Sequence, residues 1–100
     1  MNALPNRIDI LGEMTIAAAA ELRRQLLAAL AEASELDVDL SQVSEIDSAG
    51  MQLLVAAKRE ASAQGKLLRF TNHSAAVFYA LELCKLTGHL GDPVLIQSQS

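Results

Sequence analysis

Apolar and polar residues alternate in several short stretches of the chain, a pattern typical of half-buried β-strands. In the second stretch, Leu36, Val38 and Leu40 fall on one face and two aspartates fall on the other. The polar residues 41–47 that follow are interpreted as a connection. Strands are therefore predicted at residues 7–11, 36–40 and 66–71, with a short fourth one at 94–96.

Three longer stretches repeat apolar residues every three to four positions, which indicates amphipathic helices. They span residues 16–33, 49–63 and 75–87. The hydroxyl of Thr15 is predicted to cap the first of them, and Gly65 is a suitable C-terminal residue for the second. Alternation of strands and helices predicts the α/β class, with parallel strands joined by helices.

Length and composition narrow the range of functions. One hundred residues, 51% of them hydrophobic, suffice for one domain, expected over residues 1–100 with its core at about 7–96 and a frayed tail at 97–100. Twelve acidic against eight basic residues give a net charge of −4. Such a chain is a poor candidate for binding nucleic acid or an anionic membrane. It shows neither a membrane-spanning stretch nor a signal peptide, so we expect a cytoplasmic protein without membrane insertion.

Residues that commonly carry catalysis are scarce. Cys84 is the single cysteine and cannot form an internal disulfide, and no Cys and His residues have the spacing of metal ligands. The sequence shows no nucleophile–base pair and no glycine-rich phosphate loop. We therefore expect no cofactor, no metal and no enzymatic activity.

Polar residues at two predicted strand or helix ends are candidates for function, because sites in open α/β sheets gather there. These are residues 39–41 and 47–50. Ser48 suits the N-cap of the second long helix, beside unpaired amides that favour a phosphate, and Gly50 is expected to leave those amides accessible. The residues alone leave two readings open: Ser48 as a helix cap only, or Ser48 as a phosphate-bearing site.

The motifs, taken in order, resemble one family. They are Gly12-Glu13-Met14, Ala20-Glu21-Leu22-Arg23, Asp39-Leu40-Ser41-Gln42-Val43, Ile46-Asp47-Ser48-Ala49-Gly50, Lys58-Arg59-Glu60-Ala61 and Gly65-Lys66-Leu67-Leu68. Together they resemble the STAS family, and most of all its single-domain bacterial anti-sigma factor antagonists. The resemblance covers residues 8–90 and implies a small, mixed, mostly parallel sheet of four to five strands packed with three to four helices.

The resemblance also implies a switch. In that family the serine that matches Ser48 is phosphorylated by a serine kinase with a histidine-kinase-like ATP-binding fold, which often doubles as an anti-sigma factor. A serine phosphatase of the metal-dependent type removes the phosphoryl group. Asp47 and Asp39 match acidic positions close to that serine, so their charges are expected to oppose the phosphoryl charge.

A partner surface is expected around Ser48. Four apolar residues close together follow the motif, namely Met51, Leu53, Leu54 and Val55. Since they cannot all face one side, Met51 is predicted to be exposed. The residues expected to contact the partner are Asp47, Ala49, Gly50, Met51, Asp39 and Ser41.

Two departures and two alternatives stay open. Thr15 and Ala49 stand where many relatives have an aspartate and a small polar residue, which leaves the identity of the kinase open. An accessory subunit that binds the ATPase of an ABC-type lipid transporter is one alternative function. A receiver-like protein phosphorylated on Asp39 is the other, although the acidic pair and lysine that such chemistry needs are not evident.

Overall fold

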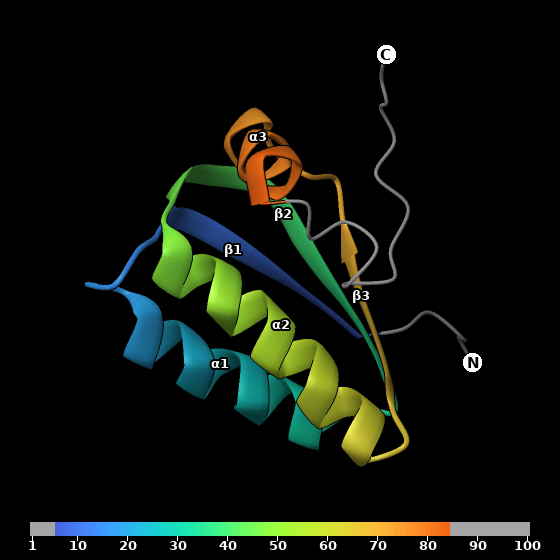
Figure 1. Ribbon diagram of the computed structural model, residues 1–100. Coiled ribbons are helices and arrows are strands. Elements are labelled where there is room, and N and C mark those ends of the chain that lie inside the picture. Colours follow the sequence, from blue (N-terminus) through green and yellow to red (C-terminus); the bar gives the residue numbers. More distant parts are fainter. Residues whose placement is uncertain (1–5, 85–100) are drawn as a thin grey trace.

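Strands and helices follow one another in the order that the sequence predicts. The computed structural model describes residues 6–84, which form β1 (Asn6–Met14), α1 (Ala19–Ala31), β2 (Glu35–Ile46), α2 (Ser48–Ala63), β3 (Leu67–Thr71) and α3 (Ala75–Cys84) (Figure 1). In the sheet, β2 lies between β1 and β3, and both pairs are parallel. The predicted α/β class and parallel strands are thus confirmed. The count of four to five strands is not confirmed, because residues 6–84 contain three and the strand predicted at 94–96 lies outside them.

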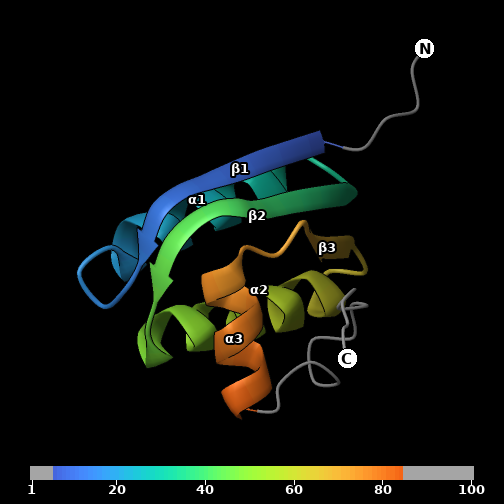
Figure 2. The same cartoon turned by 90° about the horizontal axis from the view of Figure 1, so that it is seen from above.

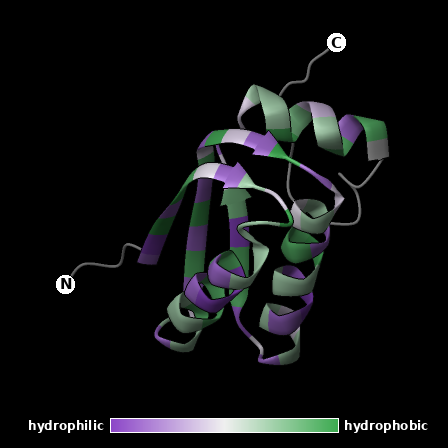
Figure 3. Ribbon diagram, turned by 90° about the vertical axis from the view of Figure 1, so that its left-hand side faces the viewer, coloured by the Kyte–Doolittle hydropathy of each residue, from purple (hydrophilic) through white to green (hydrophobic). Residues whose placement is uncertain are grey.

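Two helices, α1 and α2, lie side by side against one face of the sheet (Figures 1 and 2). The reason is visible in the strands, where hydrophobic and hydrophilic residues alternate (Figure 3). In β2, Leu36, Val38 and Leu40 are fully buried, as predicted, whereas Asp37 and Asp39 point to the other face. In α1, Leu22, Leu26 and Leu30 recur at every fourth position and are buried.

The third helix, α3, packs beside the second half of β2, where β3 has already ended (Figure 2). Its first turn is tied to β2, because the amide of Ser74 donates to the carbonyl oxygen of Leu40 at 3.2 Å. The hydroxyl of Ser74 in turn accepts a hydrogen bond from the amide of Val77. Val77 and Leu81 are completely buried and complete the core on this side.

The sequence interpretation is wrong for residues 41–46, which continue β2 instead of forming a connection. They pair with the last part of β1, and the register shifts between Asp9 and Leu11 and again between Gly12 and Glu13. These shifts break the period-two pattern, so the polar residues of this segment resemble a loop in sequence. As a result, β2 continues beyond Asp39, where its pairing with β3 ends, and leads directly to Asp47.

The start of α1 also differs from the prediction. The helix begins at Ala19, and its N-cap residue, Ala18, makes no side-chain cap. Thr15 is not the cap, because its hydroxyl donates to a carboxylate oxygen of Glu13 at 3.1 Å. The segment between β1 and α1 is held instead by the carboxylate of Asp47, which accepts the amide of Ile16.

Candidate functional site

The candidate site lies at the junction of β2 and α2. Asp47 is the N-cap of α2, and its carboxylate accepts a hydrogen bond from the amide of Gly50 at 3.0 Å. The sequence predicted Ser48 as the cap, and this is wrong, because Ser48 is the first residue of the helix. Both residue types cap helices well, and the extended backbone of Asp47 decides between them.

The same carboxylate braces the segment before α1. Its second oxygen accepts a hydrogen bond from the amide of Ile16 at 2.9 Å. The amide of Asp47 itself donates to the carbonyl oxygen of Met14, at the end of β1. Hydrogen bonds from the amides of Ile16 and Gly50 lower the pKa of the Asp47 carboxyl, because they stabilise its charged form. One ionised side chain thus fixes two segments that are 31 residues apart.

Ser48 is exposed, and Ala49 beside it is half-buried. Ser48 therefore lies at the surface, on a first helical turn that is held by the hydrogen bond from the Gly50 amide to Asp47. The bonds from the amides of Ile16 and Gly50 lower the pKa of Asp47 and keep its carboxylate ionised. A phosphoryl group on Ser48, the next residue, would therefore stand beside a negative charge. This geometry leaves Ser48 accessible to another protein and places an ionised carboxylate beside any charge added there.

Gly50 and Met51 are both buried, so neither has the role that the sequence predicted for it. A Cβ atom on Gly50 would lie 2.1 Å from the carbonyl oxygen of Met14, so glycine permits close packing of α2 on β1 and does not serve to expose amides. The prediction that Met51 is exposed is wrong, since only 4% of it is accessible. The helix α2 packs against both the sheet and α1, and this broad contact buries Met51, Leu53, Leu54 and Val55 together.

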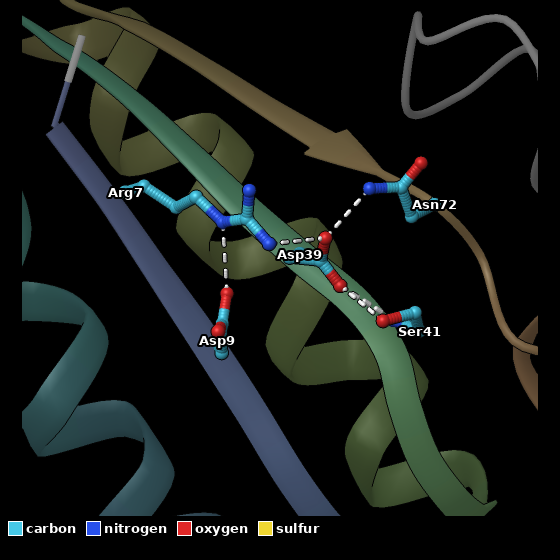
Figure 4. A network of polar contacts seen from close by, with 5 residues as sticks. All are labelled: Arg7, Asp9, Asp39, Ser41 and Asn72. Carbon is cyan, nitrogen blue, oxygen red and sulfur yellow. Dashed lines mark hydrogen bonds and ion pairs between the residues drawn. The ribbon is translucent and has the colours of Figure 1, made fainter.

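The second predicted group, Asp39 and Ser41, forms a polar network in the middle of β2 (Figure 4). Asp39 is 2% exposed. One of its oxygens accepts the amide and the hydroxyl of Ser41 at 2.8 and 2.6 Å. The other accepts Asn72 Nδ2 at 2.6 Å and Arg7 Nη2 at 2.9 Å. The Ser41 hydroxyl, then Asn72 and the charge of Arg7, lower the pKa of Asp39 to about 2 despite burial.

The structure does not place Asp39 beside Ser48. The network lies on the face of the sheet away from α2 (Figure 4), at the level where β3 ends. From Asp39 to the end of β2, an extended strand covers on the order of 20 Å. The two predicted groups are therefore separate, and the expected repulsion between Asp39 and a phosphoryl group on Ser48 is withdrawn. Both carboxylate oxygens of Asp39 accept hydrogen bonds, and its side chain is buried. Asp39 is therefore also poorly placed for receiver-like phosphorylation.

Three residues of these sites were not identified from the sequence. Arg7 and Asn72 join Asp39 from positions more than thirty residues away. Asn72 has a left-handed backbone with φ of 52°, a conformation that asparagine tolerates better than most residues. Ile16 adjoins Asp47 through its backbone alone, which leaves no trace in the side-chain pattern.

Among residues 6–84, no three His, Cys, Asp or Glu side chains are grouped so that they could hold a metal ion. No helix in this part of the chain combines the length and apolar character needed to span a bilayer.

Replacing Asp47 by asparagine is expected to separate its two roles. Asparagine caps helices about as well as aspartate, but its single carbonyl oxygen cannot serve both amides. We expect amide hydrogen exchange at Ile16 to accelerate by about tenfold while that of Gly50 stays protected. Asp47→Ala, the control, should accelerate both. Equal protection of the two amides in Asp47→Asn would show that Asp47 does not hold Ile16 and Gly50 through separate carboxylate oxygens.

Comparison with known proteins places this geometry in context. The family described as "Mlab, STAS domain" matches residues 3–96. The anti-sigma factor antagonist SpoIIAA, solved in its unphosphorylated form, has a similar fold, with a TM-score of 0.64, 22% identity, and coverage of 89% of this chain and 79% of SpoIIAA. Mglu gives a TM-score of 0.57 at 19% identity, over 64% of this chain but 16% of the Mglu chain. A search of curated proteins finds no significant match.

Proposed function

Because this chain belongs to the STAS domain family, and its fold is that of an anti-sigma factor antagonist, we propose that it is a regulatory binding protein switched by phosphorylation of Ser48. In this proposal the unphosphorylated form binds a serine kinase with a histidine-kinase-like ATP-binding fold, which also acts as an anti-sigma factor. Binding releases what that partner restrains, and a serine phosphatase restores the binding form. The proposal describes a cytoplasmic, non-enzymatic protein that acts through one domain.

The observation that carries the proposal is the position of Ser48. Ser48 is exposed as the first residue of α2. The turn that carries it is held by the bond from the Gly50 amide to Asp47 and by the close packing of Gly50 against Met14. A kinase substrate needs a hydroxyl that reaches into another protein's active site. The similarity to a relative described in its unphosphorylated form supports the same kind of control here.

The switch needs no change of fold. A phosphoryl group adds about −1.5 to −2 charges and considerable bulk at the surface of the first turn. Asp47 beside it is ionised, and its lowered pKa keeps it so at every physiological pH. Within an interface that excludes water, such a charge without a counter-charge costs several kcal/mol. A hundredfold loss of affinity requires about 2.7 kcal/mol, which lies within that range.

Ser48→Asp is expected to weaken partner binding by about a hundredfold, whereas Ser48→Ala keeps binding and loses phosphorylation. The test is affinity capture from cell extract with each variant, read by mass spectrometry, together with labelling by ATP. Ser62→Asp is the matched control, because Ser62 is also exposed and lies near the other end of the same helix. It adds the same charge outside the motif and should leave capture unchanged.

Two outcomes would contradict the proposal. Quantitative phosphorylation of Ser48 with unaltered affinity would show that the modification does not act as a switch. Capture of an ABC-type ATPase without labelling of Ser48 would instead favour the accessory-subunit function.

A further inference from the structure

Ile16 is a large apolar side chain that the fold leaves at the surface beside the candidate site. It is 75% exposed, and its amide donates to the Asp47 carboxylate at 2.9 Å. A single exposed apolar residue is ordinary on a protein surface. Ile16 differs in that the Asp47 carboxylate, which belongs to the Ser48 motif, holds its backbone amide, so the position of Ile16 is fixed relative to that motif.

The surroundings of Ile16 make it protrude. The chain continues as Ala17-Ala18-Ala19-Ala20, and Ala49 follows Ser48 on the facing helix. Ala17, Ala20 and Ser48 are exposed. Side chains this small leave the isoleucine uncovered, in agreement with its exposure of 75%.

Charge at this end of the molecule has one sign. No Lys or Arg occurs in residues 8–22 or 41–57, the segments that meet at the Asp47 brace. Glu13 and Glu45 are exposed register partners at the ends of β1 and β2. A complementary partner therefore presents basic side chains toward the sheet ends and an apolar surface toward Ile16.

Resting on the proposed function, we propose that Ile16 is the apolar anchor of the interface that Ser48 controls. The occupant of this surface is a protein with an apolar pocket for Ile16, bordered by basic side chains that face Glu13 and Glu45. Buried apolar anchors near the centre of an interface contribute most of its affinity, whereas charges at the rim mainly affect association. Ser48 directly follows Asp47, whose carboxylate holds the amide of the anchor, so a phosphoryl group on Ser48 would bring its charge into the apolar part of this interface.

The test uses the full chain and the protein that it captures, once that protein has been identified by mass spectrometry and purified. Ile16→Ser is expected to weaken binding at least about tenfold, mainly through faster dissociation. Leu83→Ser is the matched control, because Leu83 is 80% exposed on α3, and it should change affinity less than about twofold. An unchanged midpoint of urea unfolding verifies that Ile16→Ser still folds.

A second pair of variants tests the basic border. Glu45→Gln should slow association at low salt and reduce its dependence on ionic strength, whereas Glu32→Gln, at the C-terminal end of α1, should not. Equal effects of these two variants would overturn the basic border.

The outcomes separate this inference from the proposed function. If Ser48→Asp weakens binding and Ile16→Ser does not, the anchor is wrong and the switch stands. If Ile16→Ser weakens binding and Ser48→Asp does not, the anchor stands and the switch is wrong. Binding that depends on neither residue overturns both.

Discussion

Gly50→Ala is expected to lower the free energy of unfolding by about 3 kcal/mol or more, even though alanine is the better helix former. In an open helix the same exchange would stabilise by about 1 kcal/mol. Here the new Cβ would lie 2.1 Å from the carbonyl oxygen of Met14 and 2.8 Å from Ile46 Cγ1. The first contact is with backbone, which cannot move aside by rotating a side chain, so repulsion outweighs propensity.

The consequence extends to the candidate site. To relieve the contact, the first turn of α2 must move away from β1, and this strains the hydrogen bonds of Asp47 to Gly50 and to Met14. Gly50→Ala should therefore lose partner binding together with stability, although Gly50 is buried.

Urea unfolding followed by circular dichroism measures the effect. Gly65→Ala is the control, because Gly65 has φ of +70° and a Cβ atom added there would have no other atom within 4 Å. It carries only the cost of a left-handed alanine, about 1 kcal/mol. A Gly50→Ala protein at least as stable as Gly65→Ala would refute the close packing, whereas a variant that does not fold agrees with it.

The fold follows largely from local patterns in the sequence. The alternation in residues 36–40 and the repeat of Leu22, Leu26 and Leu30 identify elements whose burial the structure confirms. Parallel pairing follows because each strand is separated from the next by a helix. Local patterns are less informative at residues 41–46, because a register shift interrupts the alternation and makes half of β2 look like a loop.

The candidate site is only partly visible in sequence. The sequence correctly places the start of a helix in the segment 47–50, although a strand and not a loop precedes it. It assigns the N-cap to Ser48 and surface exposure to Met51, and both assignments are wrong. Both errors arise from neighbours that are distant along the chain. The carboxylate of Asp47 also accepts the amide of Ile16, which lies 31 residues earlier. Met51 is buried because α2 packs against both the sheet and α1. A single sequence contains no record of these contacts.

Asp39→Asn is the second substitution with a large expected effect, and we expect it to destabilise the protein by about 2 kcal/mol at neutral pH. Asp39 is buried, and its carboxylate accepts four hydrogen bonds from Ser41, Asn72 and Arg7. Asparagine keeps the shape of the side chain but replaces one oxygen by a donor, which then faces two donors. Asp37→Asn is the control on the same strand, because Asp37 pairs with Arg69 near the surface. Its loss should cost less than about 1 kcal/mol.

The pH dependence of stability tests the charge of Asp39 directly. Its folded-state pKa of about 2 lies below the ordinary value of 3.8, so the unfolded chain binds the proton more readily. The stabilisation from the carboxylate is therefore complete above about pH 4 and is lost as the pH falls toward about 2. Glu21 and Asp47 also have lowered pKa values, so the wild-type curve alone does not isolate Asp39. The difference in unfolding free energy between wild type and Asp39→Asn does isolate it, and this difference should shrink by about 2 kcal/mol between pH 5 and pH 2. A difference that stays constant over this range would show that the Asp39 carboxylate does not stabilise the fold through its charge.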